Sequence, residues 1–278
     1  MAAVSAAPDS GEAVALRDLN ALAAYGGRRF LVCGTLQFIY PRALVERRRD
    51  SAASYRFDFP DMAIEDLVSA AVINYQTPDL LDTAVRSFHS HYPGVTILVI
   101  DNGSSDESPA VIEALSAELG SAIEARVLNE NRYHGPAMDL ALRELETDYV
   151  YIFDSDTETL RSGFLEQIML LASRDGVYGV GQIVHVNKRG FAVKAGIPVL
   201  VSAHMLINRS VYLTLPPFIH HGLPALANFK AASERGLRLE SYPISGYVKH
   251  FGRGTAERFG YGLGLRSRLD YLLNKIGL

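Results

Sequence analysis

Cysteine is almost absent from this chain of 278 residues, and that absence limits how the fold can be held together. Because Cys33 is the single cysteine, no disulfide can form within the chain. A chain of this length buries roughly three quarters of the surface that its unfolded form exposes, so its core needs no disulfide. The low cysteine content fits a reducing compartment.

Long apolar runs are also missing. The longest one, residues 196–207, has 12 residues and is interrupted by His204, whereas a membrane-spanning helix needs about 20. Near the N-terminus no positively charged segment precedes an apolar stretch, so we expect no signal peptide. We therefore expect a cytoplasmic protein, either free in solution or peripheral at the membrane.

An excess of basic charge is the third missing feature. The chain has 27 basic and 31 acidic residues and a net charge of −4, whereas a nucleic-acid binder usually carries a basic excess. We therefore expect no nucleic-acid partner. Hydrophobic residues at 48% and charged residues at 21% are close to globular averages, which excludes a disordered chain, a collagen-like fibre and a coiled coil.

Most of the chain alternates between apolar runs and helical patterns. Helices are predicted to begin near Pro78, Pro136 and Pro224, and at Pro109 with Ser108 as the capping residue. Strands are predicted at residues 67–74, 95–100, 125–128, 149–153, 177–186 and 199–208. This alternation indicates an α/β fold with a mostly parallel sheet flanked by helices.

Both ends of the chain differ from this pattern. Residues 1–62 show no clear alternation and are interpreted as an N-terminal extension before a main domain of residues 63–256. Within residues 257–278, leucine and isoleucine recur at helical spacing, which predicts an amphipathic C-terminal helix. The basic segment 42–49 and this helix either pack on the domain or contact a partner, such as an anionic membrane or a second copy of the chain.

Polar residues follow three of the predicted strands. Asn74 follows the first, Asp101 ends the second, and Asp154 and Asp156 follow the fourth. Because parallel strands bring their carboxyl ends to one edge of a sheet, these residues should converge there. Asp154 and Asp156 form an Asp-x-Asp pair, and its hard oxygen ligands suit Mg²⁺ or Mn²⁺, which are often shared with substrate phosphates.

The Asp-x-Asp pair has two interpretations. One is the metal–diphosphate site of a nucleotide-sugar glycosyltransferase, and the other is the nucleophile of a haloacid-dehalogenase-type phosphatase. The phosphatase motif normally lies on the first strand of the core and needs a later acidic pair. Here three predicted strands come first, and no two acidic residues stand together after Glu166. The glycosyltransferase interpretation is favoured, and the phosphatase remains a remote alternative.

Four segments carry a resemblance to a known family. Residues 71–81, 97–106, 129–135 and 151–156 resemble, in order and spacing, the motifs of family-2 glycosyltransferases of the GT-A fold. The resemblance covers residues 66–160 well and 176–256 more loosely. It implies a Rossmann-like nucleotide-binding half and transfer of a sugar from a nucleotide-diphosphate sugar, typically UDP-linked, to an acceptor hydroxyl. It further implies a divalent metal, Mn²⁺ or Mg²⁺, and inversion at the sugar.

The resemblance also implies which residues bind the nucleoside. Asn74 and Tyr75 would line the pocket for the base and ribose. The Asp101 carboxylate, with Asn102 beside it, would accept a hydrogen bond from the base, typically from uracil N3–H. The segment that reaches the ribose and diphosphate would contribute Asn131, Gly135 and Asp139.

For the metal and the diphosphate, the resemblance implies a second group of residues. Asp154 would face the ribose or the donor sugar, and Asp156 would bind the metal. His250 stands where many GT-A enzymes have a late histidine that helps to bind metal or diphosphate. Arg253 lies between two glycines and would either clamp a phosphate through two hydrogen bonds or be a surface residue of a structural loop. The remaining histidines show no spacing that ties them to the site: His89, His91, His185 and His204.

One departure from the family concerns the general base. Inverting members usually carry an acidic residue before the helix that here begins near Pro224, but residues 176–233 contain no Asp or Glu. This chain has His220 and His221 there instead. We predict that His221, or else His220, accepts the proton. One alternative is that both bind the acceptor or cap the loop; another is that an acidic residue from elsewhere in the chain folds in, Glu234 and Glu240 being the nearest in sequence.

The absence of the acidic residue also supports a second candidate function. This is a non-catalytic GT-A scaffold that binds nucleotide or glycan without turnover. If the protein is an active enzyme, its acceptor is a glycan, a lipid-linked molecule, a peptide or a small molecule, and the sequence does not distinguish these classes.

Overall fold

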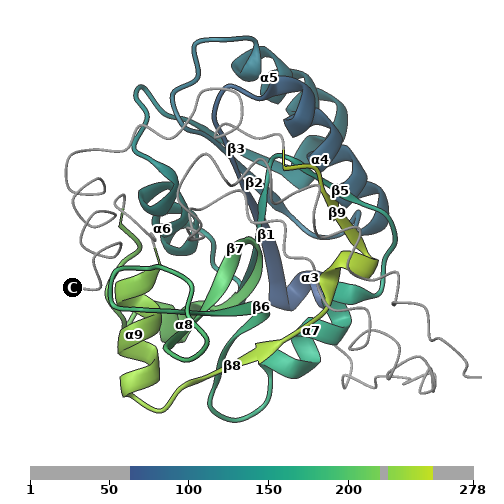
Figure 1. The fold of residues 1–278 in the computed structure, drawn as a ribbon. Coiled ribbons are helices and arrows are strands. Elements are labelled where there is room, and N and C mark those ends of the chain that lie inside the picture. Colours follow the sequence, from purple (N-terminus) through teal and green to yellow (C-terminus); the bar gives the residue numbers. More distant parts are fainter. Residues whose placement is uncertain (1–62, 220–224, 253–278) are drawn as a thin grey trace, which may run out of the picture.

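The computed structural model describes residues 63–219 and 225–252. This part of the chain forms a central sheet with helices on both faces (Figure 1). The predicted N-terminal extension, residues 1–62, and the predicted C-terminal helix, residues 257–278, lie outside the described residues. Both therefore stay predictions.

The predicted alternation of strands and helices is confirmed. The strands are β1 Val68–Asn74, β2 Ile97–Asp101, β3 Ile123–Val127, β4 Tyr149–Asp154, β5 Thr157–Thr159, β6 Val177–Val186, β7 Ile197–Asn208, β8 Arg238–Ser241 and β9 Val248–His250. The α-helices are α3 Ile64–Leu67, α4 Pro78–His91, α5 Ser108–Leu119, α6 His134–Glu144, α7 Phe164–Ala172, α8 Arg209–Tyr212 and α9 Leu226–Glu234. Single 3₁₀ turns, η2 Gly120–Ala122 and η3 Ile244–Gly246, complete the described elements.

The main sheet has seven strands in the order β3-β2-β1-β4-β7-β6-β8. Neighbours are parallel from β3 to β4, whereas β7 is antiparallel to both β4 and β6, and β8 is parallel to β6. Within this sheet β7 alone therefore runs in the opposite direction, which confirms the mostly parallel sheet. A separate ribbon of β5 and β9 is antiparallel.

Two hydrophobic clusters fill the faces of the sheet. All seven residues of β1 are buried, as expected for a parallel strand that is covered on both sides. Its side chains alternate: Val72 belongs to the cluster under α4, α5 and α7, and Ile73 to the cluster under α6, α8 and α9. A continuous apolar run thus holds the centre of the sheet rigidly, and the polar residues at its carboxyl end sit on that base.

One local prediction is wrong: Ser108 does not cap α5. The helix begins at Ser108 itself, with Glu107 before it. The Ser108 hydroxyl is buried and finds no hydrogen-bond partner among the described residues. Instead, Asp106 Oδ1 accepts the Ser108 backbone N–H at 3.0 Å, because an Asp side chain readily bonds the backbone two residues on.

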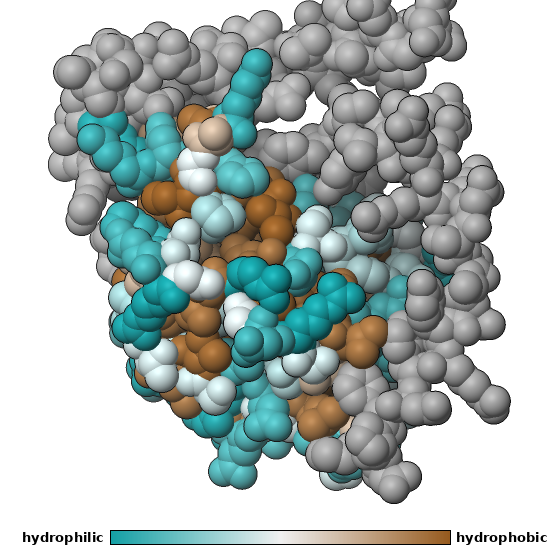
Figure 2. Space-filling view, turned by 90° about the horizontal axis from the view of Figure 1, so that it is seen from below, coloured by the Kyte–Doolittle hydropathy of each residue, from teal (hydrophilic) through white to brown (hydrophobic). Residues whose placement is uncertain are grey.

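The surface seen from the side of α7, β8 and α9 is mixed in character. Figure 2 shows hydrophobic residues there in several patches that hydrophilic side chains separate, which is usual for a globular protein. In residues 63–219 and 225–252, no helix combines the length and the apolar character that crossing a membrane requires.

Candidate metal and nucleotide site

The polar residues that follow the strands converge at one edge of the sheet, as the sequence predicts. Asn74 is the partner of Asp101 in the β1–β2 register, and Ile73 is the partner of Asp154 in the β1–β4 register. Asn74 and Asp101 have no exposed surface, and Asp154 and Asp156 are 7% and 3% exposed. Carboxylates buried this deeply need partners or a cation, so their grouping points to a binding site.

A hydrogen-bond network joins the ends of β1 and β2. Asn74 Nδ2 donates to Asp101 Oδ1 at 2.9 Å, and Asp101 also accepts the backbone N–H and the hydroxyl of Ser104 at 2.9 and 2.6 Å. On the other side, the Thr77 hydroxyl donates to Asn74 Oδ1 at 2.7 Å and lies 2.9 Å from Ser155 Oγ. The network therefore ties the loops after β1, β2 and β4 together. Tyr75 follows Asn74 in this loop and is half-buried.

The loop after β2 also holds the loop that leads into α6. Asn102 Oδ1 accepts the backbone N–H of Arg132 at 2.9 Å. Gly103 has a φ of +73°, and a Cβ at this position would lie 2.5 Å from the backbone carbon of Glu130. The close approach of the two loops thus depends on glycine.

The residues just before α6 adopt an uncommon backbone conformation. Tyr133 has a φ of 69°, where residues other than glycine are rare. Asn131 Oδ1 supports the turn by accepting the Tyr133 backbone N–H at 2.7 Å. The turn places His134 at the first position of α6 and the buried Gly135 directly after it.

Asp139, on the same helix, is already engaged. It accepts a hydrogen bond from Arg143 Nε at 2.9 Å and another from the Tyr212 hydroxyl at 2.5 Å. The contact with Tyr212 joins α6 to α8. The role of Asp139 toward a ribose or diphosphate stays a prediction, as do the roles of Asn131 and Gly135.

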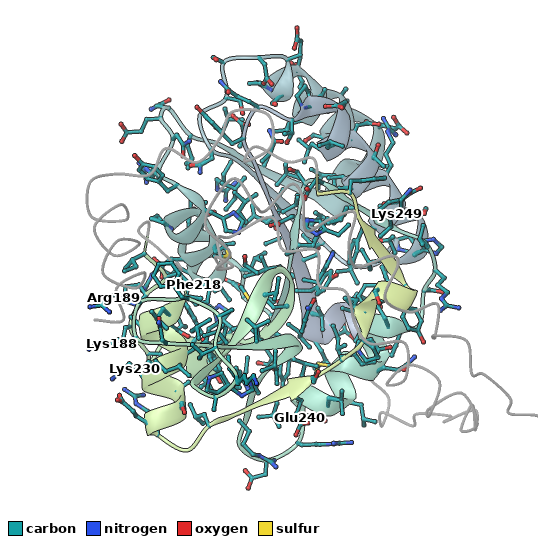
Figure 3. The ribbon with its side chains drawn as sticks, viewed as in Figure 1. Lys188, Arg189, Phe218, Lys230, Glu240 and Lys249 are labelled. Atoms are coloured by element: carbon teal, nitrogen blue, oxygen red, sulfur yellow. The ribbon has the colours of Figure 1, made fainter. Side chains whose placement is uncertain are left out.

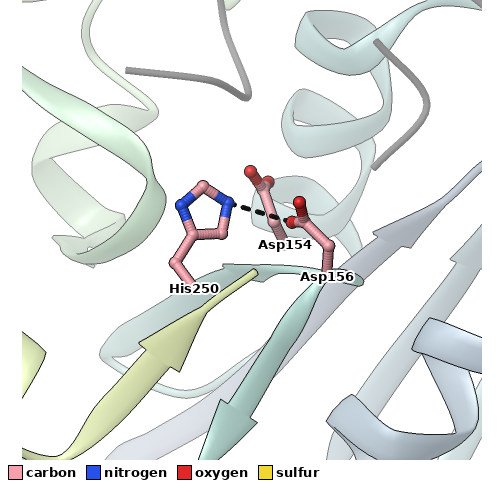
Figure 4. A group of neighbouring side chains, drawn as sticks. All are labelled: Asp154, Asp156 and His250. Atoms are coloured by element: carbon pink, nitrogen blue, oxygen red, sulfur yellow. Dashed lines mark hydrogen bonds and ion pairs between the residues drawn. The ribbon is translucent and has the colours of Figure 1, made fainter. Parts of the chain in front are cut away.

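The group with metal-ligand character consists of Asp154, Asp156 and His250. Each offers one ligand atom, and these atoms lie within 4.8 Å of one another. His250 Nε2 lies 3.0 Å from Asp156 Oδ1, and Figure 4 shows this contact with Asp154 beside it. Carboxylate oxygens and imidazole nitrogens are both common ligands of divalent metals in proteins.

The β5–β9 ribbon brings His250 to the carboxylates. His250 pairs with Thr157 in its register, and the Phe251 N–H donates to the Asp156 carbonyl at 2.9 Å. The neighbouring residue, Lys249, is labelled in Figure 3, and its Nζ lies 3.9 Å from Oε2 of Glu158 on β5. Because successive strand residues point to opposite faces, His250 points away from this exposed pair and into the site.

The electrostatics of the carboxylates favour a cation. Burial raises the pKa of Asp154; the charges of His134 and His250 oppose this rise, and that of Asp156 adds to it. Asp154 Oδ1 is buried and has no hydrogen-bond partner among the described residues. A carboxylate oxygen of Asp154 without a hydrogen-bond donor, beside Asp156 and His250, fits a divalent metal. Such a metal would supply positive charge to the two buried carboxylates.

Two histidines that the sequence did not assign to the site lie in it. His134 Nε2 is 3.6 Å from Asp154 Oδ1. The ring of His204 lies 5.9 Å from that of His250, centroid to centroid, so His204 adjoins the site although no spacing along the sequence ties it there. The reason is the antiparallel pairing of β7 with β4, which sets His204 opposite Phe153. His185 is exposed on β6, and His89 and His91 are half-buried on α4.

His204 differs from His250 in its protonation. Burial, together with the charge of His250, lowers the pKa of His204 to about 3, so its ring is neutral. Burial would also lower the pKa of His250, but the hydrogen bond to Asp156 and the charges of Asp156 and Asp154 outweigh it and raise that pKa above 6.5.

Metal binding should therefore weaken as the pH falls. A protonated His250 has no lone pair on Nε2, so a metal must displace that proton. Because the pKa of His250 in the metal-free protein lies above 6.5, the loss of affinity should begin above that pH and grow below it. Mn²⁺ titrations followed by electron paramagnetic resonance between about pH 6 and pH 8 measure the effect. His250→Ala should bind more weakly and with a flatter pH profile; a wild-type Kd that stays constant over this range would contradict the prediction.

Three predicted residues lie outside the described part of the chain: His220, His221 and Arg253. The helix after the two histidines, α9, begins at Leu226 and has no acidic residue in its first turn. The first turn of α9 in the described part of the chain thus adds no carboxylate next to the position where the family would carry its base.

Comparison with known proteins agrees with this fold. The sequence model described as glycosyl transferase family 2 matches residues 69–232, which is more than half of the chain. No curated protein sequence matches the chain.

Two solved structures are similar in fold. The mannosyltransferase PcManGT from Pyrobaculum calidifontis, solved with GDP-Man and Mn²⁺, is 17% identical with a TM-score of 0.52, over 63% of this chain and 54% of that chain. The glucosyl-3-phosphoglycerate synthase from Mycobacterium tuberculosis, solved with phosphoglyceric acid, is 18% identical with a TM-score of 0.51, over 79% of this chain and 86% of that one. The present chain thus matches only about half the length of the mannosyltransferase.

The family match runs from β1 into α9 and includes all three polar strand ends. The mostly parallel seven-stranded sheet flanked by helices matches the GT-A fold of the two solved structures. The chain therefore belongs to glycosyl transferase family 2.

Proposed function

We propose that this protein is a metal-dependent enzyme that transfers a sugar, with inversion, from a UDP-linked donor to an acceptor hydroxyl. One observation carries the proposal: the ligand atoms of Asp154, Asp156 and His250 lie within 4.8 Å of one another. They stand at the same sheet edge as the polar network of Asn74 and Asp101. The mannosyltransferase of similar fold was solved with GDP-Man and Mn²⁺, which supports a nucleotide-sugar donor and a metal here.

In this proposal the residues of the metal group divide the work. Asp156 and His250 hold the divalent metal, and Asp154 faces the ribose or the donor sugar. When bound, the metal neutralises charge that develops on the departing diphosphate. Arg253 would add two N–H groups to the same diphosphate. The family match leaves the phosphatase interpretation of Asp-x-Asp without support.

The test is an assay of transfer and of donor hydrolysis with UDP-, GDP- and dTDP-sugars, each in Mn²⁺, Mg²⁺ and EDTA. We expect turnover of a UDP-sugar in Mn²⁺ that EDTA abolishes. Equal turnover in EDTA would contradict the metal dependence. Turnover confined to a GDP-sugar would contradict the choice of base and leave the metal-dependent transfer standing.

Asp101→Ala should weaken UDP binding by roughly tenfold or more. The Asp101 carboxylate holds both Asn74 and Ser104 at the proposed base pocket, and losing a buried hydrogen bond costs on the order of 1–3 kcal/mol. A loss of about 1.4 kcal/mol corresponds to tenfold in Kd. Isothermal titration with UDP in Mn²⁺ measures the change. Asp106→Ala is the matched control, because Asp106 lies in the same loop but bonds Ser108 of α5; an unchanged Kd in Asp101→Ala would place the base pocket elsewhere.

A second candidate function is a scaffold that binds a nucleotide without turnover. The observation that favours it is the first turn of α9, which carries no acidic residue. Binding of UDP in Mn²⁺ with neither transfer nor hydrolysis, across the donor panel, would support the scaffold over the enzyme.

A further inference from the structure

His204 is a buried histidine at the back of the candidate metal centre. Only 8% of its surface is exposed. Its Nδ1 makes a 3.1 Å hydrogen bond with the Tyr151 hydroxyl, while its Nε2 has no hydrogen-bond partner among the described residues. Leaving such a nitrogen unpaired costs stability, so a partner that appears in another state of the site would account for it.

The sheet brings His204 to the metal group from the side of β7. His204 stands directly opposite Phe153, the residue before Asp154, and residues opposite each other share a face of the sheet. Its ring meets the His250 ring nearly at a right angle, at 84°, with centroids 5.9 Å apart. The two rings are therefore in edge contact, and in this state no hydrogen bond joins His204 Nε2 to His250.

We propose that His204 is a positioning residue of the metal centre, and that its Nε2 exchanges a hydrogen bond with Nδ1 of His250 while Tyr151 holds its ring from the other side. The inference rests on the proposed metal site. Ring nitrogens of metal-binding histidines almost always have such a partner, and removing the partner typically costs 10–100-fold in metal affinity.

The chemistry of His250 explains why the partner is a histidine. When His250 Nε2–H donates to Asp156, neutral His250 has a lone pair on Nδ1 and needs a donor there. When Nε2 instead faces a metal, Nδ1 carries the hydrogen and needs an acceptor. A neutral imidazole can act as either, and so can the Tyr151 hydroxyl behind it. An apolar side chain of similar size at position 204 can do neither.

The test is a Mn²⁺ titration of the full chain by electron paramagnetic resonance, with four variants. His204→Leu removes the polar partner, and His204→Gln restores a terminal amide that can donate or accept. Tyr151→Phe removes the hydroxyl that holds His204 and leaves His204 itself in place. Tyr178→Phe is its matched control: Tyr178 is equally buried in the sheet, and its hydroxyl donates to Asn228 at 2.5 Å, in the cluster under α9.

We expect the Kd for Mn²⁺ to rise about 10–100-fold in His204→Leu, to rise less in Tyr151→Phe, and to stay near the wild-type value in His204→Gln and Tyr178→Phe. A wild-type Kd in either His204→Leu or Tyr151→Phe would overturn the inference, and so would equal losses in His204→Leu and His204→Gln. Thermal unfolding in EDTA reports stability separately, and a purely structural role would lower it without changing the Kd. A wild-type protein that binds no Mn²⁺ would overturn the proposed metal dependence as well, which keeps the two failures distinct.

Discussion

Asp156→Asn should reduce glycosyl transfer by roughly a thousandfold or more. Metal stabilisation of a departing group supplies several kcal/mol, and each 1.36 kcal/mol is a factor of ten in rate. Asparagine keeps the shape of the side chain but loses the charge that holds the cation beside Asp154 and His250. The kcat for a UDP-sugar in saturating Mn²⁺ should fall and the Kd for Mn²⁺ should rise. The Kd for UDP in EDTA should change little.

The fold should survive this substitution. In the metal-free protein the charge of Asp156 adds to the rise in the pKa of the buried Asp154, so removing it relieves repulsion between two buried carboxylates. At a pH above the pKa of His250, where no ion pair between Asp156 and His250 is lost, we therefore expect the Tm in EDTA to be unchanged or higher. Asp175→Asn, at an exposed position before β6, is the control and should keep full activity. Activity of Asp156→Asn close to that of the wild type would exclude Asp156 as a metal ligand.

A single histidine substitution before α9 should cost about 10²–10⁴-fold in kcat, the usual contribution of a general base. We propose that His221, or else His220, accepts the proton of the acceptor hydroxyl. An unperturbed histidine has a pKa of about 6.5 and is neutral above it, so wild-type activity should fall as the pH drops through about 6–7. The measurement is the pH–rate profile of the wild type and of His220→Ala and His221→Ala.

The control for these histidines is His185→Ala, on the exposed side of β6. It should keep both kcat and the acid limb of the profile. If one of the two variants loses kcat and the acid limb together, that histidine is the base. If both variants keep a near-normal kcat, neither histidine is the general base. The alternative that the two histidines bind the acceptor or cap the loop would then account for them.

Much of the fold follows from local signals in the sequence. The run Val68–Asn74 is apolar without alternation because both faces of β1 are covered, and that is the signature of a parallel strand. Proline marks the start of α4, since it fits the first helical turn. The Ser108 cap failed because α5 begins at Ser108 itself, and the side chain that bonds the backbone there is that of Asp106, two residues earlier; local sequence does not rank these two polar side chains.

Some residues of the candidate site were predictable from the sequence, and others were not. Asn74, Asp101, Asp154 and Asp156 follow strands, and parallel strands must bring their ends to one edge, so the sequence by itself determined that these residues meet. The sequence also pointed to His250 through its resemblance to the family. What it left undecided was how His250 reaches Asp156, because this depends on the pairing of β5 with β9 across 94 residues. Only the tertiary structure placed His204 and His134 in the centre. His204 reaches it because β7 pairs antiparallel with β4, and His134 because α6 begins directly after a loop with an uncommon backbone conformation. Both placements depend on the order of strands in the sheet and on the position of a helix, and the spacing of residues along the chain predicts neither.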